Sequence, residues 1–276
     1  MDSAVKILTD KNRVNALAKG LRVLEAFPAE APELTLAEVA RRARLDNATA
    51  FRMLNTLMEA GYIDKVGTTR RFRLTLKCLD LGFSAIARSD LRQLARPVLR
   101  TLVGPMIEAA SVGVLDGADV VYVERVQAGL VRLGVDIRTG SRVPAYATAI
   151  GQAILSCLDP AEQRAVLTSR PLQVLTPYTI IDEDALMARL TLVKLRGYAL
   201  SDQETVLGLR VLASPLLDID GVPIGALSVA CPGFGGTIDG FETTAAAPVM
   251  AAAATLSRAL QAAGNFAPPL TVPPSS

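Results

Sequence analysis

The pattern of apolar and polar residues in the first quarter of the chain predicts short helices. Residues 13–26 repeat apolar side chains at the spacing of one helix face, namely at Val14, Leu17, Leu21 and Leu24. A proline-containing loop at 28–34 then leads to T-L-A-E, in which Thr35 and Glu38 have the spacing of a capping box. The second helix is therefore expected to begin after Thr35 and to end near Leu45.

The third helix and the segment after it complete a familiar order of elements. Asp46 can cap a helix over about residues 47–60, and Gly61 is expected to end it. Two strand-like runs at 62–65 and 71–74 are joined by VGTT, which predicts a hairpin. Three short helices followed by a hairpin are the order of a winged helix-turn-helix domain.

The third helix has a polar side whose purpose the pattern also indicates. Its inward stripe consists of Ala50, Met53, Leu54 and Leu57, and its other side carries Asn47, Thr49, Arg52, Asn55 and Thr56. Amides, hydroxyls and guanidinium groups read base edges and phosphates in a major groove. The hairpin adds Arg70, Arg71 and Arg73, which could reach the flanking DNA backbone. An ordinary solvated face is the alternative, but the order of the elements favours a DNA-binding surface.

The remaining chain alternates between strand-like and helical patterns. The predicted strands cover 111–115, 119–126, 131–136, 197–202, 210–218 and 223–230, and the predicted helices cover 76–88, 90–109, 148–158, 160–168, 182–196 and 242–263. Early strands that pair as hairpins, interrupted by long helices, predict an antiparallel sheet covered by helices. The sequence thus predicts an α+β protein with a DNA-binding domain at 1–75, a linker helix at 76–89, a sensor-like domain at 90–264 and a disordered tail at 265–276.

Composition narrows the chemistry. The chain contains no histidine, which removes the usual serine–histidine and cysteine–histidine catalysis and imidazole metal sites. Its three cysteines form no C-x-x-C pair, so we expect no metal site, no cofactor and no disulfide.

No apolar run is long enough to span a bilayer and no signal peptide is evident, so a soluble cytoplasmic protein that does not enter membranes is expected. The glycine-rich segment 232–237 lacks the Lys-Ser/Thr ending of a phosphate loop and precedes no clear helix, which favours a flexible loop.

The charge is uneven along the chain. Residues 1–75 hold 13 Lys and Arg against 9 Asp and Glu, a net charge of +4, whereas the whole chain carries only +2. A basic N-terminal part followed by a mildly acidic remainder indicates that the N-terminal part alone binds a polyanion.

Four segments together resemble the IclR family of bacterial transcriptional regulators, over nearly the whole span 14–263. They are ALAKGLRVLEAF, LDNATAFRMLNTLMEAGYI, RVPAYATAIGQAIL and DQETVLGLRVLASPLLD. The last two look most like the branch that regulates protocatechuate, 4-hydroxybenzoate and β-ketoadipate catabolism. The resemblance implies a GAF-like effector-binding domain after the winged helix-turn-helix domain and linker helix. It also implies a double-stranded DNA operator, a small organic acid as effector, and a homodimer or a tetramer formed as a dimer of dimers.

The residues suggest where a carboxylate effector could bind. The helix expected from about Thr148 follows a loop with Arg142 and Tyr146, and a helix N-terminus beside a guanidinium can hold a carboxylate. The resemblance implies further positions near the effector, which are Ala149, Ile150, Ser201 or Asp202, Val211, Ser228 and Ala230, the last being a serine in some relatives. The predicted effector site comprises Arg142, Tyr146, Thr148, Ala149, Ile150, Asp202, Arg210 and Ser228.

Structural roles are the alternative for several of these residues. Arg142 could be a surface loop charge, and Tyr146 could be a core ring. Arg210 could pair with Asp202 or Glu204 and fix the end of a strand. Ser228 could be a satisfied core hydroxyl.

Two other functions compete with an effector-responsive regulator. One is a constitutive DNA-binding protein whose C-terminal domain only oligomerises, which would show no ligand effect. The other is an enzyme with an accessory helical domain, but the chain has neither a G-x-S-x-G nucleophile elbow nor a phosphate loop. A regulator and no enzyme is therefore the prediction.

Overall fold

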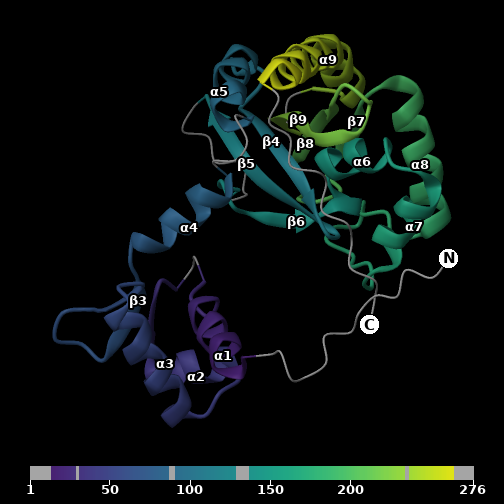
Figure 1. Cartoon of the computed structure of the whole chain (residues 1–276). Coiled ribbons are helices and arrows are strands. Elements are labelled where there is room, and N and C mark those ends of the chain that lie inside the picture. The colour runs from purple at the N-terminus through teal and green to yellow at the C-terminus, as the bar shows by residue number, and fades with distance from the viewer. Residues whose placement is uncertain (1–13, 29–30, 87–90, 129–136, 234–235, 264–276) are drawn as a thin grey trace. The chain divides into compact units, whose positions relative to one another are not determined.

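The computed structural model describes residues 14–28, 31–86, 91–128, 137–233 and 236–263. The chain divides into two compact units, residues 1–85 (unit 1) and 86–276 (unit 2). Figure 1 shows both units, and each is described by itself below.

Unit 1 has the predicted winged helix-turn-helix order. Its helices are α1 (Asn15–Leu24), α2 (Leu36–Ala43), α3 (Asn47–Glu59) and α4 (Lys77–Ile86), the last of which reaches the boundary with unit 2. Its strands are β1 (Glu33–Thr35), β2 (Ile63–Lys65) and β3 (Arg71–Leu74), which form an antiparallel sheet in the order β1-β3-β2. Strand β1 begins inside residues 28–34, for which the sequence predicts a loop. It pairs Leu34 with Phe72, and the two buried side chains account for the extra strand.

The predicted helix boundaries in unit 1 are confirmed by their hydrogen bonds. Thr35 N–H donates to Glu38 Oε2 at 2.8 Å, and Glu38 N–H donates to Thr35 Oγ1 at 3.4 Å, which is the capping box. Asp46 caps α3 by accepting from the backbone N–H of Thr49 at 2.8 Å. Gly61 follows α3 at φ +78°, in the left-handed region that glycine adopts without strain.

Most of the apolar stripe predicted for α1 faces solvent rather than the core of unit 1, although Leu24 packs partly against that core. Val14, Leu17 and Leu21 are 65%, 63% and 50% exposed. The helix is held instead by Val23, which packs with the core of α2, α3, β2 and β3. The spacing therefore identified the helix, but most of the marked face is left uncovered by the described residues of unit 1.

In its described residues, unit 2 is built on a six-stranded antiparallel sheet in the order β6-β5-β4-β9-β8-β7. The strands are β4 (Ala109–Asp116), β5 (Asp119–Gln127), β6 (Arg142–Pro144), β7 (Ala199–Asp202), β8 (Leu209–Leu217) and β9 (Pro223–Pro232). Helices α5 (Leu91–Leu102) and α9 (Ile238–Ala263) cover one face. The 3₁₀ helix η2 (Ala145–Ala147) and helices α6 (Ala149–Leu155), α7 (Pro160–Thr168) and α8 (Glu183–Arg196) cover the other (Figure 1).

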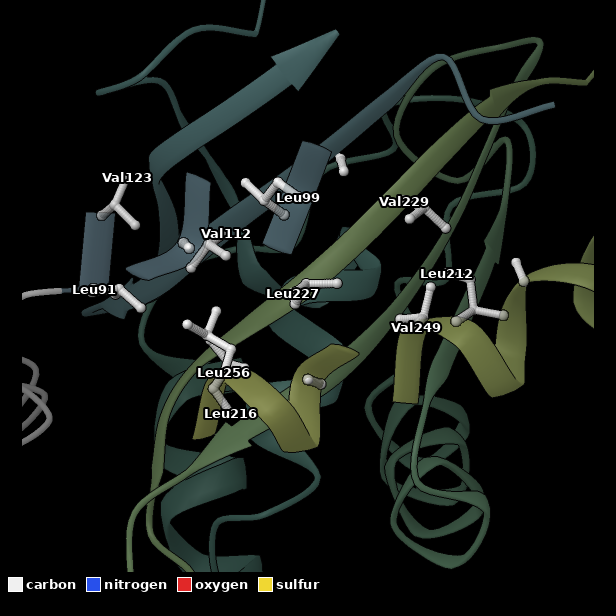
Figure 2. Close-up of a cluster of buried hydrophobic side chains, with 14 of the residues drawn as sticks. Leu91, Leu99, Val112, Val123, Leu212, Leu216, Leu227, Val229, Val249 and Leu256 are labelled. Carbon is white, nitrogen blue, oxygen red and sulfur yellow. The ribbon is translucent and has the colours of Figure 1, made fainter. Parts of the chain in front are cut away.

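The two faces of the sheet bury alternate residues of its central strands. Figure 2 shows Leu212 and Leu216 of β8 and Leu227 and Val229 of β9 packed with Val249 and Leu256 of α9. Their sequence neighbours Ala213 and Ala226 join the core on the opposite face, which includes Ile150 of α6. Because successive side chains of a strand point to opposite faces, this alternation shows which residues share a face.

Several predicted boundaries in unit 2 are wrong. The helix expected at 90–109 ends at Leu102, where a turn leads into β4. The loop expected around residue 142 contains β6, which pairs with β5. Helix α9 begins at Ile238, so the glycine-rich segment 232–237 is followed by a helix after all. The strand expected at 131–136 and the tail expected at 265–276 lie outside the described residues.

Within the described part of the chain, no helix is both long enough and apolar enough to cross a bilayer.

Candidate functional site

Helix α3 turns most of its predicted polar residues toward solvent. Asn47, Arg52, Asn55 and Thr56 are exposed, whereas Thr49 is only partly so and lends its backbone N–H to the Asp46 cap. The Thr56 hydroxyl donates to the backbone oxygen of Arg52 at 3.1 Å. The Arg52 guanidinium itself has no hydrogen bond or ion pair with any residue that the structure describes. Amide and guanidinium groups on this face are therefore available to a partner.

An aromatic residue that sequence reasoning passed over lies in the same face. Phe51 is 48% exposed and stands one helical turn from both Asn47 and Asn55. A phenyl ring can contact a thymine methyl group, which polar side chains do not recognise well. The signal was present in the sequence, because the inward stripe through Ala50 and Leu54 leaves no place for Phe51 in the core.

The hairpin arginines differ in how far they are engaged within unit 1. Arg71 donates through Nη1 to the Glu33 carbonyl at 3.0 Å, and Arg73 lies 3.5 Å from Asp64. Arg70 is exposed and has no such partner among the described residues. Arg71 and Arg73 thus help to hold the small sheet together. Of the three arginines, Arg70 is the one whose guanidinium makes no hydrogen bond or ion pair with the described residues.

The structure places Arg142 and Tyr146 in structural positions. Arg142 lies on the surface, 2.6 Å from Asp116 Oδ2 and 3.6 Å from Asp119 Oδ2. The Tyr146 hydroxyl accepts from the Gln173 N–H at 2.8 Å and donates to the Gln173 carbonyl at 2.7 Å. These contacts satisfy both groups within unit 2, so the placement favours a surface ion pair and a core ring.

The N-terminus of α6 is also satisfied internally. Thr148 caps the helix by accepting from the Gly151 N–H at 3.0 Å. Ala149 and Ile150 are buried in the core between α6 and the sheet. These three residues support the sheet face without lining the cavity described below.

Asp202 at the end of β7 pairs with Arg210 near the start of β8, with 3.0 Å between Asp202 Oδ1 and Arg210 Nε. On β8, Arg210 shares a face with Leu212, which packs with α9, whereas Val211 points to the opposite face. The structure therefore separates this ion pair from Val211.

A small cavity opens on the α6 side of the sheet. It is lined by Tyr122, Arg125, Ile137, Thr205, Leu209, Val211, Ser228 and Ala230. Ser228 is thus the one predicted effector residue that the structure brings to it, together with Val211 and Ala230, which the resemblance added. The empty space between the walls, including the open mouth of the cavity, is about 390 Å³. The volume that the centre of a water molecule can occupy is only about 20 Å³. One water needs roughly 10–15 Å³ by that measure, so the cavity is narrow in this structure.

A β-bulge carries Arg125 into this cavity. Gly113 on β4 pairs with Tyr122, but Val112 pairs with Glu124, so Val123 is an extra residue on β5. Glu124 consequently points to the α5 side, where its carboxylate lies 2.7 Å from Arg92 Nε and 3.7 Å from Arg96 Nη1. Without the bulge, regular alternation would place Glu124 rather than Arg125 on the same face of the sheet as Tyr122.

Arg125 has little to balance its charge. Its Nη1 donates to Ser111 Oγ at 3.0 Å, and its Nε is buried without a partner among the described residues. Burial lowers the pKa of the Arg125 guanidinium, and no carboxylate of the described residues opposes that shift. Burial also raises the pKa of Tyr122 to about 12, so its hydroxyl stays protonated near neutral pH. Sequence reasoning missed Arg125 because the bulge that turns it inward is not visible in the residue pattern.

The D-Q-E motif of the fourth marker segment has a structural role. Buried Glu204 accepts from Gln152 Nε2 at 2.9 Å and from Arg189 Nη1 at 3.0 Å. Burial raises the pKa of Glu204, and the charge of Arg189 opposes the shift. The motif thus ties the loop between β7 and β8 to α6 and α8.

Comparison with known proteins matches both units to one family. Residues 16–67 match the description "IclR helix-turn-helix domain", and residues 83–258 match "Bacterial transcriptional regulator IclR C-terminal".

The similar proteins include regulators and a ligand complex. The chain is 33% identical over 221 residues to the Pca regulon regulatory protein of Pseudomonas putida, covering 80% of this chain and 75% of that one. It is 35% identical over 219 residues to the p-hydroxybenzoate hydroxylase transcriptional activator of Acinetobacter baylyi, covering 78% and 80%. A solved IclR homologue from Microbacterium hydrocarbonoxydans, in complex with 4-hydroxybenzoate, superposes with a TM-score of 0.78 at 26% identity, covering 90% and 99%.

Proposed function

The chain belongs to the IclR family of bacterial transcriptional regulators, and we propose that it binds a DNA operator under the control of a small organic acid. The family consists of regulators rather than enzymes, and its helix-turn-helix domain binds DNA. The observation that carries the proposal is the exposed face of α3, on which Arg52 has no partner among the described residues.

The proposed operator contacts follow from the chemistry of that face. Arginine can bind guanine through two parallel hydrogen bonds, and asparagine can bind adenine in the same manner. Arg52, Asn47 and Asn55 are thus the proposed base-reading residues. Arg70 is the proposed phosphate contact, because its free guanidinium lies on the hairpin that follows α3.

A second copy of the chain is the proposed cover for the exposed face of α1. Val14, Leu17 and Leu21 form a continuous apolar stripe, and monomeric proteins rarely leave such stripes uncovered. A twofold dimer would place two α3 helices on a near-palindromic operator.

Replacing Leu17 with aspartate is expected to shift the protein from dimer toward monomer. The charge would lie in the proposed apolar contact and be desolvated there. Sedimentation velocity at several protein concentrations measures the change, and the exposed loop substitution Ile219→Asp serves as control. An unchanged association constant in Leu17→Asp would contradict the assigned contact.

The proposed effector is a small carboxylic acid that binds in the cavity of unit 2. Support comes from the unbalanced Arg125 in the cavity wall and from the homologue that was solved with 4-hydroxybenzoate. A regulator that binds DNA and responds to a metabolite would act in the cytoplasm.

The test is a titration of the protein against labelled DNA from its own upstream region, followed by fluorescence anisotropy with and without aromatic and dicarboxylic acids. A shift of the binding curve by one acid supports the proposed control. Operator binding that no acid changes favours a constitutive DNA-binding protein. Absence of specific binding across genomic fragments at low salt would contradict the assignment of α3.

Replacing Arg70 with alanine is expected to weaken binding to operator and to unrelated DNA by similar factors. A phosphate contact carries no base information, and its loss should lower the salt slope by about one counterion. Measuring both DNAs at several salt concentrations checks this. A loss confined to the operator would instead make Arg70 a base-reading residue.

A further inference from the structure

The cavity of unit 2 combines one cation with two hydroxyl groups that have no hydrogen-bond partner among the described residues. Arg125, Ser111 and Ser228 lie in one row across β5, β4 and β9, because Ser111 is the registered partner of both others. Neighbours in such a row have side chains about 4.5–5.5 Å apart at Cβ. The Ser228 and Tyr122 hydroxyls make no hydrogen bond with any described residue, although both residues are buried. Arg125 Nε is in the same state.

These three groups share one property, which is that each can donate a hydrogen bond. A partly buried guanidinium without a counter-ion is unfavourable unless a ligand supplies the negative charge. A carboxylate accepts hydrogen bonds and offers no donor, so it satisfies the guanidinium and the hydroxyls together. A cationic or purely donating ligand would leave the same groups unsatisfied.

The rest of the wall limits the ligand to a single carboxylate. Ile137, Leu209, Val211 and Ala230 are apolar, and Arg125 is the one charged residue among those that line the cavity in the described part of the chain. A second carboxylate would meet apolar side chains there and lose its hydration without a partner. An apolar body is favoured at that end of the ligand.

We propose, resting on the function above, that Arg125 anchors the carboxylate of the effector and that the cavity takes a compact monocarboxylic acid with an apolar body. The Arg125 guanidinium binds the carboxylate, and Ser228 and Tyr122 add hydroxyl donors. The apolar part lies against Leu209, Val211 and Ala230. Since the cavity is narrow, the ligand must push these side chains apart to enter, which links binding to a change in the packing of β8 and β9.

Calorimetric titration of the full-length protein tests the anchor without DNA. The probes are benzoate, 4-hydroxybenzoate, their uncharged amides, and terephthalate as the dicarboxylate. The acids are expected to bind at least about tenfold more tightly than the amides, as the loss of a charged hydrogen bond implies. Terephthalate is expected to bind more weakly than benzoate. Equal binding of acid and amide, or no binding of either acid, would overturn the proposal.

Variants at two arginine positions locate the anchor. Arg125→Gln is expected to weaken acid binding at least about tenfold, and Arg142→Gln, which removes a surface cation, should leave it within about twofold. Arg125→Lys, which keeps the charge, should retain part of the affinity and serves if the glutamine variant does not fold. The opposite ranking of the 125 and 142 variants would refute the assignment.

Operator binding without acid separates this inference from the proposed function. Arg125→Gln should bind the operator as the wild type does while losing the response to acid. If the wild type binds the acids but no operator, the anchor stands and the regulatory role fails.

Discussion

Replacing Gly151 with alanine is expected to destabilise unit 2 by about 3 kcal/mol or more, near or above the upper end for overpacking a core. A Cβ at this position would lie 2.1 Å from the carbonyl oxygen of Ala145 and 2.4 Å from its Cα. Both atoms belong to the backbone of η2, so no side-chain rotation can make room. The close approach of α6 to η2 thus explains the glycine in the R-V-P-A-Y-A-T-A-I-G segment.

Urea unfolding followed by tyrosine fluorescence measures this effect. The chain has no tryptophan, and every tyrosine except Tyr62 lies in unit 2, so the signal reports mainly on that unit. Gly104→Ala is the matched control, since a Cβ there meets none of the described residues within 4 Å, and its effect should stay within about 0.5 kcal/mol. A Gly151→Ala protein as stable as the control would show that α6 can move away from η2 at little cost.

Replacing Arg52 with alanine is expected to lower operator affinity by about 1–3 kcal/mol for each half-site, if its guanidinium binds a base through two hydrogen bonds. The expected loss is larger for operator than for unrelated DNA, because unrelated DNA loses only one charge contact. A dimer that uses two half-sites would feel the change twice. Anisotropy titrations with operator and scrambled DNA give the ratio of the two affinities.

Arg52→Lys refines the same prediction. Lysine keeps the positive charge and most of the length but lacks the planar fork that matches a guanine edge. The lysine variant should therefore retain the salt dependence of the wild type and lose base discrimination. Unchanged operator affinity in Arg52→Ala would remove Arg52 from the base-reading residues and leave Asn47, Asn55 and Phe51 as candidates on that face.

The DNA-binding unit was largely predictable because its determinants are local. The cap at Asp46, the capping box of Thr35 and Glu38, and the stop at Gly61 each depend on residues close in sequence, and the structure contains all of them. The strand around Leu34 was missed because it exists only through its pairing with Phe72, which lies far along the chain.

The cavity was harder to predict because it depends on long-range register. The resemblance supplied Ser228, Val211 and Ala230, which do line it. Arg142 was a reasonable guess from its place before a helix, but Asp116 and Asp119 bind it at the surface. Only the pairing of β4 with β5 shows which side of the sheet Arg125 occupies.

The extra residue in β5 also sets which kind of ion the cavity can select. Glu124 and Arg125 are adjacent in sequence with opposite charges, and Val123 determines which of the two shares a face with Tyr122. If β5 paired with β4 without this bulge while keeping all its residues, the carboxylate of Glu124 would turn inward and Arg125 would turn toward Arg92 and Arg96. The same residues of β5 could therefore line either an anion-binding cavity or one that prefers amines, and the bulge decides between the two without any change in the residues of β8 or β9.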